Sequence, residues 1–230
     1  MKKNAYLFIL SQLAIFSLLA QVTVTNLLLE NKSNPSGVDV LQPRFSWQLS
    51  SNQRNVAQSA YEVKVTSTGN HLTWNSGKVP SAQSVHVPYS GSPLQSGQKY
   101  FWQVRVWDNM GKASRWSEPA NWQTGLLQSS DWKAKWIAVG YNEDSVLRPS
   151  PLFRKKFSAG KKVQSATAYI TSHGIYEAFI NGKRVGDCYL TPGWTSYNKR
   201  LQYQMYDVTP LLQSGDNAVG VTLGSGWYRS

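Results

Sequence analysis

The chain has 230 residues, enough for one large or two small domains, and a formal net charge of +12 at neutral pH. Hydrophobic residues make up 41% of it and aromatic residues 13%, while only 16% are charged, so the composition excludes a disordered chain and allows a sizeable core. The surplus of large aromatic side chains favours β-structure, where they pack on a pleated surface.

Residues 1–20 have the pattern of a secretory signal, with Lys2 and Lys3 ahead of an apolar run and Ala20 as a small residue for cleavage. We therefore expect an exported protein, periplasmic, at the cell surface or extracellular, whose mature chain begins near Gln21. The apolar run is about 16 residues long, shorter than the roughly 20 that a spanning helix needs. No membrane span is expected after removal of the signal, and an uncleaved anchor is the alternative.

The rest of the sequence has the signature of an all-β protein. Short alternating runs are broken by turn residues, and no 3.6-residue period is sustained. In residues 61–65 and 100–106 apolar positions alternate with others such as Glu62 and Lys64, which indicates strands that bury one face.

Residues 22–127 are predicted to form a fibronectin type III-like or immunoglobulin-like β-sandwich. Trp47 lies on an early strand, in a position that suits a core indole. Leu94 stands six residues ahead of Tyr100. This spacing is similar to the tyrosine corner of such sandwiches, in which the hydroxyl bonds to upstream backbone.

A polar Ser-Ser-Asp link then leads into a second predicted domain, residues 131–230, which is also made of strands. Apolar residues alternate from Tyr176 to Ile180, and Asn181-Gly182 is a strong hairpin-turn signal because both residues accept positive φ. Near residue 209 a single helical turn is expected, with Asp207 or Thr209 as its cap.

The second domain resembles the front of bacterial α-L-rhamnosidases. The segments that carry the resemblance are "DWKAKWIA", "SPLFRKKF", "AYITSHGIYEAFINGKRVGD", "LTPGWTSYNKRLQYQMYDVTPLL" and "GDNAVGVTLGSGWY". The first domain resembles the sandwich that precedes this region, through "YEVKV", "KYFWQVRVWD" and "SRWSEPANWQTGL". The resemblance implies a fibronectin-like sandwich followed by a jelly-roll β-sandwich, here incomplete at residue 230.

The same resemblance implies a glycoside hydrolase that removes terminal α-L-rhamnose with inversion, using one carboxylic acid and one carboxylate base. In the family these groups lie in a helical barrel domain downstream of the matched segments. We therefore expect no catalytic residue in this chain, no hydrolysis by this portion alone, and two partners: rhamnose-containing glycans and the downstream catalytic domain.

Metal and thiol chemistry receives little support from the sequence. Cys188, the only cysteine, is expected to be a small buried residue in a strand rather than a nucleophile. The three histidines lie far apart, which argues against zinc. No cofactor is expected, although calcium stays open because rhamnose-binding jelly-roll modules of the family hold it beside the sugar.

Eight basic residues fall between Lys133 and Lys162. One reading is attraction to an anionic partner, such as an acidic polysaccharide or a membrane surface. The other is a solvated β-surface whose Lys-rich edges discourage aggregation. A nucleic acid is not expected as a partner of an exported protein.

Candidate sugar-binding residues lie in the stretch from Ile180 to Tyr197. Asn181, Trp194 and Tyr197 combine an amide with two aromatic rings, the chemistry that sugar hydroxyls and C–H faces need. The alternative is packing within the sandwich or against the catalytic domain. For the chain as a whole, the alternatives are a stand-alone carbohydrate-binding module or a cell-surface adhesion protein.

Overall fold

The computed structural model describes residues 22–144 and 146–229, so the predicted signal at residues 1–20 lies outside the described residues. The described chain forms two compact units. The first takes residues 22–34, 42–92 and 100–121, and the second takes residues 35–41, 93–99 and 122–229. The boundary predicted between residues 127 and 131 stays a prediction; one turn of 3-10 helix, η1 (Ser129–Asp131), lies there.

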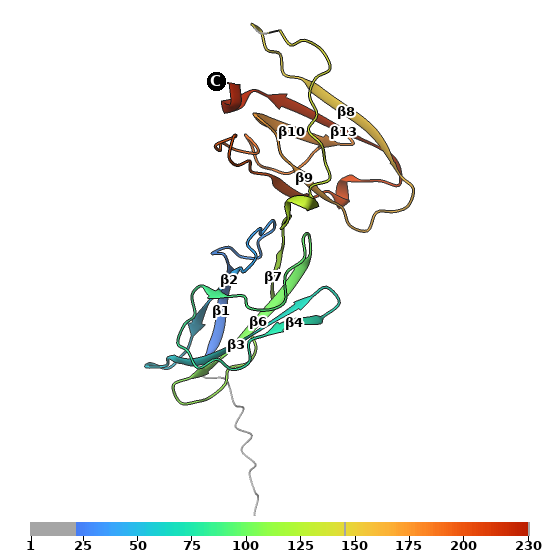
Figure 1. The fold of residues 1–230 in the computed structure, drawn as a ribbon. Coiled ribbons are helices and arrows are strands. Elements are labelled where there is room, and N and C mark those ends of the chain that lie inside the picture. The colour runs from blue at the N-terminus through green and yellow to red at the C-terminus, as the bar shows by residue number, and fades with distance from the viewer. Residues whose placement is uncertain (1–21, 145, 230) are drawn as a thin grey trace, which may run out of the picture. The chain divides into compact units, whose positions relative to one another are not determined.

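The first unit is an antiparallel β-sandwich, as predicted (Figure 1). One sheet has the order β1-β2-β5 and the other β4-β3-β6-β7. The strands are β1 (Thr23–Leu29), β2 (Arg44–Ser50), β3 (Gln58–Ser67), β4 (His71–Asn75), β5 (Val87–Pro88), β6 (Lys99–Asp108) and β7 (Ala120–Gln123). The division into units runs through the last two, since Lys99, Trp122 and Gln123 are counted with the second unit.

Aromatic rings from both sheets form much of the core of this sandwich. Phe45 on β2 and Trp102 on β6 are fully buried, with ring centroids 4.6 Å apart. Trp47 is 2% exposed, which confirms its predicted core position, and its indole N–H donates a hydrogen bond to Oε1 of Gln58 at 3.0 Å. A buried indole N–H needs such a partner. Tyr100 is buried at the start of β6, while its tyrosine corner stays a prediction.

The outer face of β3 and β6 differs from the simple alternation predicted for it. Glu62 is only 7% exposed because Arg105 lies beside it, 2.7 Å from Nη2 to Oε2. The Arg105 guanidinium also lies over the rings of Trp107 and Trp116, at 5.0 and 4.8 Å from their centroids. Lys64 lies over Trp116 at 4.4 Å. These stacked cations and rings cover the face that the sequence pattern assigns to solvent.

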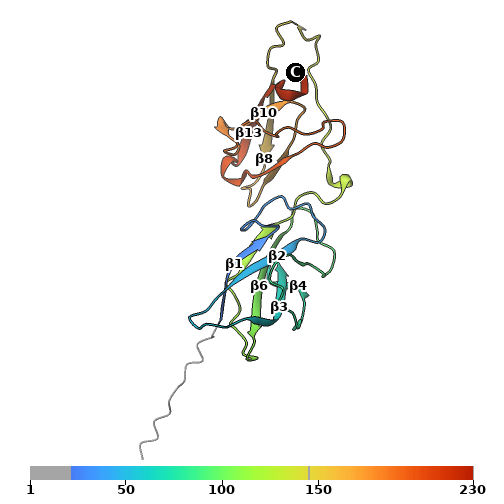
Figure 2. The same cartoon turned by 90° about the vertical axis from the view of Figure 1, so that its left-hand side faces the viewer.

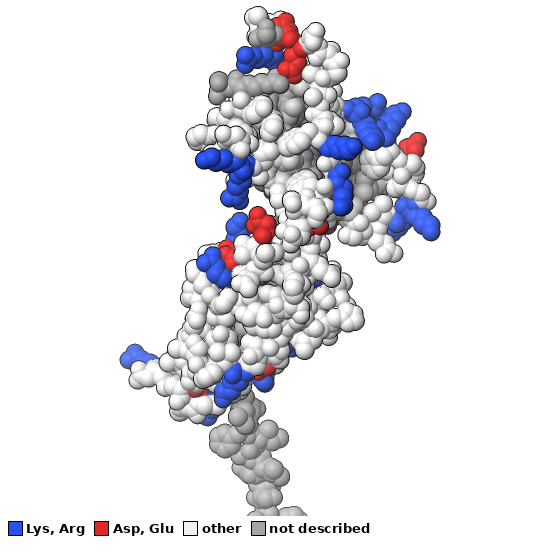
Figure 3. Space-filling model, viewed as in Figure 1, with Lys and Arg blue, Asp and Glu red and all other residues white. Residues whose placement is uncertain are grey.

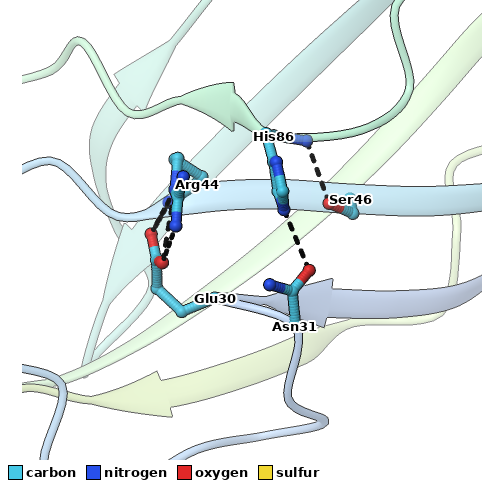
Figure 4. A network of polar contacts seen from close by, with 5 residues as sticks. All are labelled: Glu30, Asn31, Arg44, Ser46 and His86. Atoms are coloured by element: carbon cyan, nitrogen blue, oxygen red, sulfur yellow. Dashed lines mark hydrogen bonds and ion pairs between the residues drawn. The ribbon is translucent and has the colours of Figure 1, made fainter.

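A polar network joins the first sheet at the start of β2 (Figure 4). The carboxylate of Glu30 accepts hydrogen bonds from the backbone and guanidinium of Arg44, the shortest at 2.6 Å from Nη2. This bonding holds the pKa of Glu30 below its ordinary value. The His86 ring lies 3.0 Å from Oδ1 of Asn31, and the His86 backbone N–H donates to Oγ of Ser46. The network links the residue before β5 to β2 and to the turn after β1.

The second unit is also a sandwich of antiparallel strands. A four-stranded sheet of order β11-β10-β13-β8 packs on the pair β12-β9, and β8, β10 and β13 lie side by side in both ribbon views (Figure 1, Figure 2). The elements are β8 (Leu152–Ala159), β9 (Thr167–Ile170), β10 (Ile175–Ile180), β11 (Lys183–Arg184), β12 (Gln204–Asp207), η2 (Thr209–Leu211), β13 (Gly215–Gly224) and η3 (Gly226–Arg229).

Local structure in this unit follows the predicted turns. Asn181 and Gly182 have φ of +52° and +77° and close the hairpin between β10 and β11, which confirms the predicted turn. The single helical turn is η2, but its N-cap residue is Val208 rather than the predicted Asp207 or Thr209, and no described side chain caps it. Oδ1 of Asp207 instead accepts a hydrogen bond from the Thr209 N–H at 2.9 Å. No helix in the described ranges is both long and apolar enough to cross a bilayer.

Candidate functional site

A cavity of about 740 Å³ lies in the second unit, between an irregular segment, described at residues 132–144 and 146–151, and the inner face of the four-stranded sheet. Its apolar wall includes Phe153 on β8 and Val221 on β13, which are directly opposite each other. Ile137 from the irregular segment and Ile170 from β9 are also part of this wall. Concave sites of this size, with mostly apolar walls, are the usual form of a binding pocket.

A stack of aromatic rings stands at one side of the cavity. The His173 ring lies between Trp136 and Tyr228, with centroids 4.7 and 4.5 Å away and nearly parallel planes. Tyr197 meets Tyr228 edge-on at 5.3 Å. Since Trp136, His173 and Tyr228 come from three separate segments, the stack fastens the irregular segment and η3 to the loop before β10.

Three buried hydroxyls without a described partner belong to residues of this stack or to residues near them in the sequence. The buried side-chain oxygens of Ser172, Thr195 and Tyr197 have no hydrogen-bond partner among the described residues, and Ser172, which is 7% exposed, lines the cavity. Buried polar atoms are normally paired, so these three are the groups that a ligand or water would satisfy. The Tyr176 hydroxyl, in contrast, bonds to Gln204 at 3.0 Å, and burial raises the pKa of Tyr176.

The described lining of the cavity is poor in acidic side chains. Glu143 is the one carboxylate in the lining that the structure describes. An inverting glycosidase needs two carboxyl groups, about 6.5–9.5 Å apart. Within residues 22–144 and 146–229, no group of three or more His, Cys, Asp and Glu side chains is placed to hold a metal ion.

The three predicted sugar-binding residues do not form one site. Asn181 follows the last residue of β10, whereas the Thr191 segment that leads to Trp194 and Tyr197 pairs with Tyr176, near the first. Five residues of strand separate these ends, about 17 Å. The Asn181 side chain bonds to the Leu211 carbonyl, to Asn217 and to the Ala218 N–H. Trp194 is 73% exposed, and Tyr197 belongs to the aromatic stack.

Cys188 differs from its prediction as well. It is exposed and lies in an irregular stretch after β11, not in a strand. Its carbonyl accepts a hydrogen bond from Arg184 at 2.6 Å, and the same guanidinium lies 4.3 Å from the ring centroid of Tyr189. The Arg184 side chain therefore holds the backbone of this stretch in place, and the alternation of apolar residues could not indicate such a contact.

Comparison with known proteins assigns both units. Residues 24–128 match the model of the Rha78A-like N-terminal immunoglobulin domain, and residues 161–230 match that of the α-L-rhamnosidase N-terminal domain. The chain has the N-terminal domains of the α-L-rhamnosidase family. An α-L-rhamnosidase of Formosa agariphila is 39% identical over 245 aligned residues, which span 98% of this chain and 26% of that protein.

Solved α-L-rhamnosidases share the fold of this chain. The enzyme from Dictyoglumus thermophilum aligns with a TM-score of 0.84 and 38% identity, over 90% of this chain and 25% of that one. The native enzyme from Aspergillus terreus aligns with a TM-score of 0.79 and 37% identity, over 90% and 24%. The chain thus spans about a quarter of the α-L-rhamnosidases that it matches, and its match lies in their N-terminal domains.

Proposed function

We propose that this chain is the accessory N-terminal portion of an exported α-L-rhamnosidase that hydrolyses terminal α-L-rhamnosyl linkages with inversion. The observation that carries the proposal is the pair of family matches, over residues 24–128 and 161–230, together with relatives named as α-L-rhamnosidases at 37–39% identity. The two sandwiches then brace the catalytic domain and hold rhamnose-containing glycans near it.

Hydrolysis itself is assigned to residues outside this portion. Inversion requires one carboxylic acid to protonate the leaving oxygen and one carboxylate to activate water on the opposite face of the sugar. Glu143 stands without a second carboxylate in the described cavity lining, so the cavity lacks this pair. The chain on its own should therefore leave an aryl α-L-rhamnoside uncleaved.

Two experiments test the proposal. The first is to sequence the DNA that follows codon 230. A long α-helical region rich in acidic residues supports it, while an immediate stop favours a binding module and further sandwiches favour an adhesion protein. The second uses the protein encoded by the longer DNA and measures the release of the phenol from an aryl α-L-rhamnoside, together with the anomeric configuration of the rhamnose first released. Rhamnose released with retained configuration would contradict the inverting mechanism.

Sugar binding by the second unit is a separate part of the proposal. Trp194 offers an indole that is 73% exposed, and Tyr197 has a buried hydroxyl without a described partner. Titration calorimetry with L-rhamnose, with and without a calcium chelator, tests this. We expect heat of binding that Trp194→Ala removes and Tyr141→Ala, at another exposed ring, leaves unchanged. Absence of heat at millimolar sugar would contradict it, and dependence on the chelator would show a calcium requirement.

A further inference from the structure

A run of 32 residues between Asp144 and Glu177 contains six Lys or Arg residues and no Asp or Glu. Three of them, Arg154, Lys155 and Lys156, lie on β8, and Lys161 and Lys162 follow in the next turn. Figure 3 shows Lys and Arg side chains gathered over this part of the second unit. Within the described chain, none of these five residues makes an ion pair. Their charge is therefore not neutralised by the protein.

The strand register places two of these cations on the outer face of the sheet. Arg154 is opposite Gly220, Gly220 is opposite Phe179, and Phe179 is opposite Arg184, so one row of side chains crosses all four strands. Residues directly opposite each other share a face. Lys156 lies two residues further along β8, on the same face as Arg154. The buried residues of β10, such as Tyr176, face the other way.

The residue in the middle of this row is Gly220, although packing does not require a glycine there. Gly220 is not among the glycines with positive φ, and a Cβ there would meet no atom closer than the Phe153 carbonyl oxygen at 3.9 Å. A glycine inside a strand destabilises it relative to alanine, and often marks a close approach by another molecule. Ala218 is the neighbour of Gly220 on this face and has only a methyl group. The β13 backbone is therefore not covered by large side chains between the β8 cations and the half-buried ring of Phe179.

Two acidic groups share the outer face, and neither neutralises the β8 cations. Glu177 is 3.5 Å from the Arg184 guanidinium and is balanced by it. Asp216 lies opposite Ser158, diagonal to Lys156, and makes no described ion pair. Positive charge thus predominates at β8, beside an exposed backbone strip and one aromatic ring. An extended chain of sugars that carry negative groups matches all three features.

We propose that the outer face of β8, β13 and β10 binds an acidic polysaccharide. Its carboxylate or sulfate groups contact Arg154 and Lys156, and a sugar ring lies over Gly220 against Phe179. This inference goes beyond the proposed function, because it requires no cleavage of a rhamnosyl linkage. Binding would keep the protein on anionic glycan matrices, and it should weaken as salt screens the charges.

Biosensor measurements on the full chain, coupled at low density, test the proposal. Polygalacturonate supplies carboxylates, dextran sulfate supplies sulfates, dextran is the neutral control, and double-stranded DNA is an anion without sugar-face stacking. We expect binding of one or both acidic polysaccharides, stronger than DNA and lost at high salt, and no binding of dextran. The two acidic arms identify the anionic group. Equal binding of DNA, or no binding of either acidic polysaccharide at low salt, would overturn the proposal.

Paired variants separate this face from general charge attraction. Arg154→Gln with Lys156→Gln should weaken binding about tenfold at low salt, whereas Arg54→Gln with Lys112→Gln, which removes equal charge from exposed positions of the first unit, should change it less than about twofold. Equal weakening by both pairs would contradict the assignment.

A third variant tests the bare strip without any change of charge. Gly220→Val adds a β-branched side chain where space is free and should keep the strand folded, as circular dichroism can confirm. It should nevertheless weaken binding as much as the β8 pair, and unchanged affinity would overturn the placement of the sugar. Because no arm measures hydrolysis, a failure here leaves the proposed rhamnosidase function standing, and a failure of that function leaves this result intact.

Discussion

The buried amide of Asn217 provides the sharpest test of how the second unit is held together. This side chain is 3% exposed and makes four hydrogen bonds. Its oxygen accepts from the Asn181 amide at 2.8 Å and from the Gln213 N–H at 3.0 Å. Its nitrogen donates to the carbonyls of Gln213 and Gly215 at 2.8 and 2.9 Å. One amide therefore joins the hairpin turn of β10 to the loop before β13.

Asn217→Ala should lower the free energy of unfolding by about 3–4 kcal/mol, since four hydrogen bonds of about 1 kcal/mol each are lost. Asn217→Asp keeps the shape but turns an oxygen toward two carbonyl oxygens. We expect a similar loss near neutral pH, where the new carboxyl is ionised. Part of it should be recovered in acid, because burial and the carbonyl neighbours favour the protonated form, which can donate.

Pulse proteolysis across a urea series measures these free energies from the fraction of chain that survives. Asn198→Ala, at an exposed position in the same unit, is the control and should change stability by less than about 0.5 kcal/mol. Two results would refute the reasoning: an Asn217→Ala variant within about 1 kcal/mol of the parent chain, or an Asn217→Asp variant that grows less stable as the pH falls from neutral.

Three further predictions concern other contacts. Arg105→Gln should destabilise the first unit by about 2–3 kcal/mol in urea denaturation, because it leaves the buried Glu62 carboxylate without its cation; a loss below 1 kcal/mol would contradict this. The lowered pKa of Glu30 means that its contribution to stability is complete above the unfolded-state pKa and is lost as pH falls through the folded-state value. Glu30→Gln should therefore reduce the acid sensitivity of unfolding, and an unchanged pH profile would refute the link. His173→Ala should release Trp136 from its stack and speed proteolytic cleavage of the irregular segment before β8 several-fold, and an unchanged rate would show that the stack does not hold it.

The sequence predicts best what depends on local order along the chain. The all-β class follows from alternation and turn residues, the Asn181–Gly182 turn from two residues that tolerate positive φ, and the core position of Trp47 from its place on an early strand. These features need no knowledge of distant partners. The family follows from motifs that lie in order along one stretch of chain.

Features that depend on distant partners were beyond sequence reasoning. Glu62 is buried because Arg105, which lies 43 residues away, pairs with it. The aromatic stack joins Trp136, His173 and Tyr228, none of which belongs to a periodic run. Asn181 and Tyr197 are near each other in sequence, but β10 separates them in space, because the chain between them returns along that strand. Knowing that Thr191 pairs with Tyr176 would have indicated this separation.

The placement of the indoles has a practical consequence for spectroscopy. Trp47 and Trp102 of the first unit are at most 2% exposed, whereas Trp136 and Trp194 of the second are 63% and 73% exposed. Indoles shielded from water emit at shorter wavelengths than hydrated ones. The long-wavelength side of the native emission band therefore comes mainly from the second unit, so quenching of that side by a water-soluble quencher reports on that unit.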